Sequence, residues 1–113
     1  MTRQVPYPHP GEILAEEFLL PMGITPYRLA KAIHVPLTRI TAIIEGKRAV
    51  TADTALRLSA AFGLSEAFWT GLQADFDTAM VKAEIEPELA TIERFALATR
   101  AAVGRSVSPT TAL

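Results

Sequence analysis

The sequence of 113 residues contains no cysteine, which excludes disulfide bonds and metal sites built on thiolates. It also lacks any apolar run close to the roughly 20 residues that a membrane-spanning helix needs. The first residues, MTRQVPYPHPGE, lack the apolar core of a signal peptide. We therefore expect a soluble cytoplasmic protein, because a reducing compartment agrees with the missing thiols.

The sequence contains few side chains in arrangements suited to catalysis or metal binding. Histidine occurs only as His9 and His34, which lie in separate segments. His9 stands close to Glu12, but one histidine and one carboxylate make a poor metal site. The sequence offers no glycine-rich phosphate loop and no convincing Ser-His-Asp set. We therefore expect a protein that is not an enzyme and uses no metal or cofactor.

The net charge is only −1, but the charged residues are unevenly distributed. Residues 25–60 hold six basic and two acidic residues, a balance of +4, whereas residues 61–95 hold two basic and seven acidic residues, a balance of −5. This separation suggests that different faces bind different partners. The alternative for each single charge is an ordinary solvated helix face.

The hydrophobic residues, half of the sequence, follow a helical period. No stretch alternates as a strand would, and no internal repeat occurs. We expect an all-α fold, a five- to six-helix bundle in one domain over residues 1–103, followed by a disordered tail over residues 104–113. The predicted helices cover about residues 11–20, 26–33, 36–45, 52–62, 66–84 and 87–103.

Capping residues and helix breakers set the expected helix ends. Thr25 fits an N-cap, because Pro26 after it occupies the first helical position, where proline is tolerated. Glycine after a helical pattern ends the helix, and proline inside a pattern breaks it. The other expected N-caps are Thr51 and Ser65. The expected stops are Pro21-Met22-Gly23, Gly46 and Gly63, and the last helix is expected to restart at Pro87.

Two predicted helices, residues 26–33 and 36–45, are separated by a break at His34. Neither helix is long enough to be stable alone. Such a pair is typical of a helix-turn-helix, in which the first helix braces the second in the major groove of DNA. Leu29 and Ile40 fit the inward positions on either side of the break. A histidine at the break is less comfortable than glycine if its φ is positive.

Four segments resemble the HigA-type antitoxins, a branch of the phage-repressor-like (XRE) helix-turn-helix family. The segments are HPGEIL, GITPYRLAKAI, RITAIIEGKRAVTADTALRLSAAFG and FWTGLQADFD. The resemblance covers about residues 9–81 and implies a phage-repressor-like fold. It also implies a homodimer that represses its own operon by binding double-stranded operator DNA. The same protein would neutralise a cognate small basic toxin that cleaves messenger RNA.

Two other functions stay open. One is a stand-alone helix-turn-helix transcriptional regulator without a toxin, and co-purification of a small basic partner would separate it from an antitoxin. The other is a protein-interaction module that has kept the helix-turn-helix shape but does not bind DNA.

Acidic residues outside the DNA-binding face would steer association with a basic toxin by charge complementarity. Examples are Glu12, Glu16, Glu17, Asp75 and Asp77.

The third predicted helix carries the residues that we expect to read bases. Threonine hydroxyls can hydrogen-bond base edges or phosphates, and apolar side chains can pack on thymine methyl groups. Arginine can fork onto guanine or clamp a phosphate. The base-reading candidates are Leu37, Thr38, Arg39, Thr41 and Ala42. For Leu37 the alternative is core packing.

A second set of residues is expected to bind phosphates, which positions the protein without specifying the sequence. These residues are Thr25, Arg28, Lys47 and Arg48. A solvated loop is the alternative for Lys47 and Arg48. Arg57 instead fits an ion pair with Asp53, four residues before it on the same helix.

Recognition of a palindromic operator requires two copies of the domain. The last two predicted helices carry more apolar surface than the core of one chain needs, so we expect them to form the dimer contact. The expected contact residues are Trp69, Phe76, Met80, Ile92 and Phe95. Packing inside a single chain is the alternative for the aromatic residues.

Overall fold

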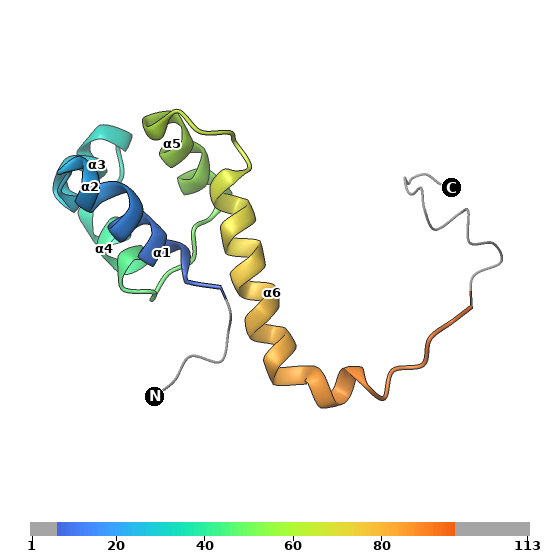
Figure 1. Cartoon of the computed structure of the whole chain (residues 1–113). Coiled ribbons are helices and arrows are strands. Elements are labelled where there is room, and N and C mark those ends of the chain that lie inside the picture. Colours follow the sequence, from blue (N-terminus) through green and yellow to red (C-terminus); the bar gives the residue numbers. More distant parts are fainter. Residues whose placement is uncertain (1–6, 97–113) are drawn as a thin grey trace.

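A computed structural model of the chain describes residues 7–96. Its elements are α1 (Pro10–Ile13), η1 (Leu14–Leu19), α2 (Leu20–Met22), α3 (Pro26–Ile33), α4 (Leu37–Ile44), α5 (Ala52–Phe62) and α6 (Phe68–Leu89). In Figure 1, α1 to α5 form a rounded cluster, along which the first half of α6 lies, while its second half extends away. The prediction of an all-α fold is confirmed, since the described residues contain no strand.

The helical stretch over residues 10–22 is continuous and contains the π-helical segment η1. The helix ends at Gly23, whose φ is 65°, so the predicted stop at Pro21-Met22-Gly23 is confirmed at its glycine. The proline itself does not end the helix, which continues through Pro21. At the end of η1 the Leu20 N–H donates to the Ala15 carbonyl, five residues back. In an α-helix, a proline ring clashes with the carbonyl four residues before it. We attribute the tolerance of Pro21 to the wider π-helical turn.

The ends of α3, α4 and α5 follow the local sequence signals. The Arg28 N–H donates to Thr25 Oγ1 over 3.1 Å, so Thr25 caps α3 as predicted. Gly46, with φ of 78°, follows α4, and Gly63, with φ of 68°, ends α5. Thr51 occupies the N-cap position of α5, but its side chain makes no capping hydrogen bond.

The last helix, α6, differs from the prediction at both ends. Ser65 is not its N-cap, because the cap position is Ala67. The helix then continues through Pro87 to Leu89, so the predicted restart at Pro87 is wrong. Alanine, glutamate and lysine before Pro87 favour the helix, and the chain leaves it within a turn of the proline. Residues 97–113, which hold the rest of the predicted last helix and the predicted tail, lie outside the described residues.

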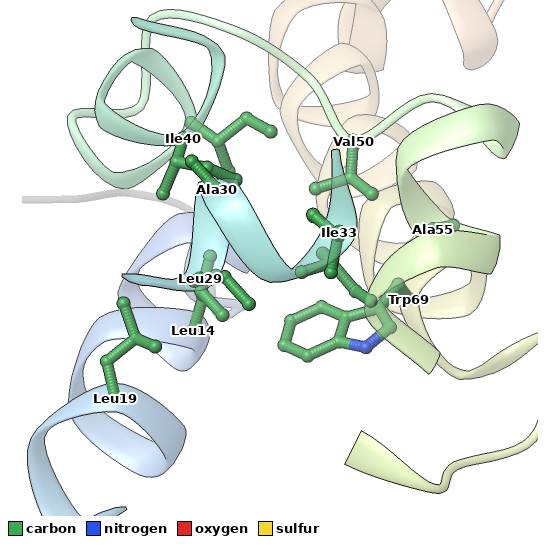
Figure 2. Close-up of a cluster of buried hydrophobic side chains, with 11 residues drawn as sticks. Leu14, Leu19, Leu29, Ala30, Ile33, Ile40, Val50, Ala55 and Trp69 are labelled. Atoms are coloured by element: carbon green, nitrogen blue, oxygen red, sulfur yellow. The ribbon is translucent and has the colours of Figure 1, made fainter. Parts of the chain in front are cut away.

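The hydrophobic core lies between the N-terminal helical stretch, α3, α4, α5 and the start of α6 (Figure 2). Trp69 is fully buried there, and its ring centroid lies 5.2 Å from that of Phe18 and 6.4 Å from that of Phe62. The prediction that Trp69 contacts a second copy is therefore wrong, because its ring fills the core of its own chain. The other buried apolar residues are Leu14, Leu19, Leu29, Ala30, Ile33, Ile40, Ile43, Val50, Ala55 and Leu58.

A buried polar side chain on α6 holds the loop between α4 and α5. Gln73 is 7% exposed, and its Oε1 accepts a hydrogen bond from the Val50 N–H over 2.7 Å. Its Nε2 donates to Asp77 Oδ1 over 2.9 Å, one helical turn further along α6. Both ends of the amide therefore have partners, which a buried polar group requires.

The start of α1 lies directly against the end of α4. His9 caps α1, because its Nδ1 accepts from the Gly11 N–H over 2.9 Å. The His9 ring also packs edge-on against Phe76 of α6, with the centroids 5.0 Å apart. A Cβ on Gly11 would collide with the backbone carbonyl of Ile43. Only glycine permits this approach, so Gly11 helps to set the position of α4.

We expect Gly11→Ala to lower the free energy of unfolding by about 1–3 kcal/mol, because the added methyl must displace α4 or distort the cap. Urea denaturation followed by circular dichroism measures the change. The matched control is Gly71→Ala on α6, where an added Cβ meets nothing within 4 Å. Alanine propensity should make that control more stable by up to about 1 kcal/mol. Wild-type stability of Gly11→Ala would contradict the close approach of α1 and α4.

Candidate nucleic-acid interface

α3 and α4 meet at a tight turn that begins with His34. His34 has a φ of 63°, and the Val35 N–H donates to the Ala30 carbonyl over 3.0 Å. A left-handed residue followed by this hydrogen bond is a common way to end a helix. Leu29 before the turn and Ile40 after it are buried, as predicted. Two short helices joined in this way form a helix-turn-helix.

Four of the predicted base-reading residues lie on one side of α4. The helical repeat of 3.6 residues places positions 37, 38, 41 and 42 within the same half of the helix. Leu37 is 41% exposed, so core packing does not explain it. Thr38 is exposed, while Thr41 and Ala42 are partly buried. Thr41 Oγ1 donates to the Thr38 carbonyl over 3.2 Å, which leaves its oxygen free to accept from a base amino group.

The loop after α4 carries two exposed basic residues, and backbone hydrogen bonds hold it to the end of the helix. The Lys47 N–H donates to the Ala42 carbonyl over 2.9 Å, and the Gly46 N–H donates to the Ile43 carbonyl over 3.0 Å. The Lys47 side chain is 75% exposed and its Nζ lies 3.4 Å from Glu45 Oε1. An exposed pair of this kind is weak, so it leaves the lysine available to a phosphate. Arg48, the next residue, is exposed as well.

The other two predicted phosphate contacts, Thr25 and Arg28, lie at the start of α3 and are both exposed. Thr25 Oγ1 already accepts the capping hydrogen bond from the Arg28 N–H. A hydroxyl that accepts one hydrogen bond can still donate its own hydrogen to a phosphate oxygen. Capping and phosphate binding are therefore compatible at Thr25.

Arg39, the remaining base-reading candidate, is paired with a residue of α5. Its Nη1 lies 3.0 Å from Asp53 Oδ2 and 3.5 Å from Thr54 Oγ1. Asp53 also accepts a hydrogen bond from Arg57 Nε over 3.0 Å, which confirms the predicted pair within α5. The contact of Arg39 was missed, because Arg39 and Asp53 are 14 residues apart and no local spacing indicates it.

The two arginines perturb the carboxyl group that they share. The hydrogen bond from Arg57 is the largest cause that lowers the pKa of Asp53 below its ordinary value of 3.8. The positive charge of Arg57 and the hydrogen bond from Arg39 lower this pKa further, while desolvation opposes them. The carboxylate is therefore the favoured form of Asp53 at neutral pH.

The predicted dimer contacts are spread along and beyond α6. Phe76 is partly buried against His9, Met80 is 39% exposed, and Ile92 and Phe95 follow the helix as exposed residues. The sequence interpretation missed Val81 and Ile85, which form a stripe of exposed apolar residues at intervals of four together with Leu89. These three line an open depression of about 430 Å³ on α6.

Residues 7–96 contain neither a candidate metal site nor a candidate membrane-spanning helix. No group of three or more histidine, aspartate or glutamate side chains lies close enough together to hold a metal ion. No helix in this range is long and apolar enough to cross a membrane. His9, which the sequence offered as a weak metal ligand, instead caps α1 through Nδ1.

Comparison with known proteins agrees with this geometry. The sequence model of the helix-turn-helix family matches residues 16–69. Virulence-associated protein I of Dichelobacter nodosus is 47% identical over 79 residues, which cover 70% of this chain and 73% of that protein. The solved structure of the Pseudomonas aeruginosa antitoxin HigA with the higBA promoter is similar with a TM-score of 0.75 at 36% identity, covering 79% of this chain and 98% of that chain. The chain belongs to the HigA-type helix-turn-helix family.

The chain is also similar to a protein that is named as a regulator. The uncharacterized HTH-type transcriptional regulator YbaQ of Escherichia coli K12 is 35% identical over 89 residues, covering 77% of this chain and 79% of that protein. In this protein, the residues 16–69 that match the helix-turn-helix model contain α3, α4 and α5 but only the first two residues of α6. The extended part of α6 therefore lies beyond the helix-turn-helix match.

We expect the stabilising effect of Asp53 in this HigA-type chain to depend on pH. Because its folded-state pKa is lowered, the contribution is present at neutral pH and is lost as the pH falls below about 4 and the carboxyl group takes up a proton. Urea denaturation of the wild type and of Asp53→Asn at pH 7 and at about pH 3 measures it. The stability difference should shrink at the lower pH. An equal difference at both values would contradict the assigned pairing.

Proposed function

We propose that this protein is a sequence-specific DNA-binding antitoxin that represses its own operon as a homodimer. The observation that carries the DNA-binding part is the surface of α4. The loop that follows α4 carries the exposed Lys47 and Arg48, and its backbone is hydrogen-bonded to the end of α4. The HigA structure from Pseudomonas aeruginosa, which contains promoter DNA, supports the same assignment by similarity.

In this proposal α4 enters the major groove and α3 braces it. Leu37 and Ala42 pack against thymine methyl groups, and Thr38 and Thr41 make hydrogen bonds to base edges. These are short, weakly polar contacts, so sequence-dependent DNA shape contributes to specificity as well. The reading surface therefore depends on close shape fit more than on charge.

Phosphate contacts on either side of α4 fix the protein on the duplex. Lys47 and Arg48 follow α4, while Thr25 and Arg28 lie at the start of α3. Contacts to phosphates carry no sequence information, but they release counterions and make affinity depend on salt. The loop after α4 and the start of α3 would thus both be attached to the DNA backbone.

The homodimer is proposed to form through the extended part of α6. The side of α6 that faces its own chain ends at Phe76, which packs on His9, and Met80 one turn later is 39% exposed. Val81, Ile85 and Leu89 form a second stripe turned by roughly 150° about the helix axis from that side. Val81 is 49% and Leu89 is 42% exposed, and a contiguous exposed apolar stripe is typical of an interaction site. Ile92 and Phe95, which follow the helix, extend this surface.

The toxin is the second proposed partner, a small basic protein that cleaves messenger RNA. The antitoxin relatives support it, and so does the negative charge outside the DNA face. Of the acidic residues predicted to steer the toxin, the exposed ones lie in two groups, Glu16 and Glu17 on η1 and Asp75 and Asp77 on α6. The alternative is a stand-alone regulator, which the similarity to YbaQ favours. Co-purification of a small basic partner from the neighbouring reading frame separates the two functions.

Fluorescence anisotropy with the duplex just upstream of the protein's own coding sequence tests DNA binding. We expect tighter binding than to a scrambled duplex and a steep decrease of affinity with salt. Lys47→Ala should weaken binding to both duplexes alike and reduce the salt slope by about one unit. The control Lys82→Ala, on α6 outside the helix-turn-helix, should keep the wild-type slope. If the wild type does not prefer the upstream duplex, the repressor function is wrong.

Analytical ultracentrifugation tests the dimer. The double substitution Ile85→Glu and Leu89→Glu places two carboxylates in the proposed apolar contact, so we expect a monomer with unchanged helicity. The matched control is Leu20→Glu on α2, a leucine that is 77% exposed but lies far from this stripe in the sequence. The control should remain dimeric. A dimer that survives the double substitution would rule out this surface of α6.

A further inference from the structure

Arg39 lies on the recognition helix, but its side chain is turned toward α5. The side chain is 25% exposed, compared with 75% for Lys47 in the loop after the helix. Besides Asp53, its Nη1 reaches the hydroxyl of Thr54, a residue that is 1% exposed. Its Nε is buried and has no hydrogen-bond partner among the described residues. The guanidinium group is thus largely inside the protein surface.

Asp53 connects this arginine to the rest of the helix-turn-helix. Oδ2 of Asp53 accepts hydrogen bonds from Arg39 of α4 and from Arg57 of α5, each over 3.0 Å. Arg57 Nη1 in turn donates to the carbonyl of Ile33, the last residue of α3, over 2.8 Å. Carbonyl groups at a helix C-terminus have no partner within the helix, so this hydrogen bond fixes the end of α3.

The chain of contacts therefore runs from α4 through α5 to the end of α3. These are the elements whose mutual angles decide how α4 meets a groove. Two hydrogen bonds from guanidinium groups to one carboxylate oxygen restrict the approach of both arginines, because such charge-assisted bonds are short and directional. These contacts hold the three helices together and occupy Arg39, so they suit a role in positioning α4 and not in contacting bases.

We propose that Asp53 positions the recognition helix and that Arg39 is its partner on that helix, not a reader of bases. This inference rests on the proposed DNA binding and deepens it, because it assigns base reading to Leu37, Thr38, Thr41 and Ala42 alone. Arg39 and Asp53 then act on specificity through the angle of α4. Neither residue touches a base.

The two possible roles of Arg39 predict opposite effects of Asp53→Asn. If Arg39 reads a base, Asp53 competes with DNA for the arginine and adds negative charge near the phosphates. Its neutralisation then strengthens operator binding. If Asp53 positions α4, its neutralisation releases the brace and weakens operator binding, whereas non-specific binding through Lys47 and Arg48 remains. The sign of the change decides between the roles.

The test measures anisotropy with the full-length chain, for operator and scrambled duplexes at one salt concentration. The variants are Asp53→Asn, Arg39→Ala and the double substitution, after circular dichroism has confirmed their helicity. We expect each single variant to lower the ratio of operator to scrambled affinity on the order of tenfold. The double variant should lower this affinity ratio no further than either single variant, because both substitutions remove the same contact between Arg39 and Asp53. Asp53→Glu, which keeps the charge, should retain part of the ratio.

Operator duplexes with single base-pair changes supply the second measurement. A positioning role predicts that Arg39→Ala lowers discrimination by a similar factor at every base pair that α4 reads. If Arg39→Ala loses discrimination only at one G·C pair, the proposal is overturned. Tighter operator binding by Asp53→Asn overturns it as well. Asp75→Asn on α6 is the control for removal of a charge and should leave the ratio unchanged. A wild type that fails to prefer its operator overturns the proposed function itself, which separates the two failures.

Discussion

The burial of Trp69 is the interaction on which the rest of the structure depends. α3 and α4 have eight residues each, too few for a helix to be stable alone in water. Their positions must therefore come from what packs against them. Trp69 brings the start of α6 into the same cluster as Ile33 of α3 and Ala55 of α5 (Figure 2). One side chain from the last helix thus completes the support of the helix-turn-helix.

The same helix also joins the two proposed binding surfaces. Gln73, one turn after Trp69, holds the backbone of Val50 at the end of the loop that contains Lys47 and Arg48. Phe76, almost one turn further, packs on His9, which caps the helix that touches α4. The stripe proposed to form the dimer begins only five residues later, at Val81. A rigid helix that carries both surfaces would set the distance between two reading helices in a dimer.

Local signals in the sequence were sufficient for α3, α4 and α5 but not for contacts between them. Thr25 before Pro26 predicted the start of α3, since capping and proline tolerance act within one turn. The pair of Arg39 with Asp53 was not predictable, because it depends on how two helices cross. The exposure of Trp69 was misjudged for the same reason. A helical pattern shows which side chains are apolar, but not whether the chain itself or a second copy covers them.

Several of the basic residues in the middle of the chain make contacts within the protein itself. Of the basic residues in positions 25–60, Arg39 and Arg57 share Asp53, and Lys31 Nζ lies 5.8 Å from the centroid of the Tyr27 ring. This leaves Arg28, Lys47 and Arg48 as the exposed cations at the edges of the reading helix. Few phosphate contacts per chain mean that electrostatic attraction supplies only part of the affinity for a chosen site. In the proposed function, discrimination between base pairs then comes from small apolar and hydroxyl groups that act over short distances, and such contacts require an accurate angle of α4. The proposed positioning of α4 by Asp53 would supply that angle, because its carboxylate holds Arg39 of α4 and Arg57 of α5 at once.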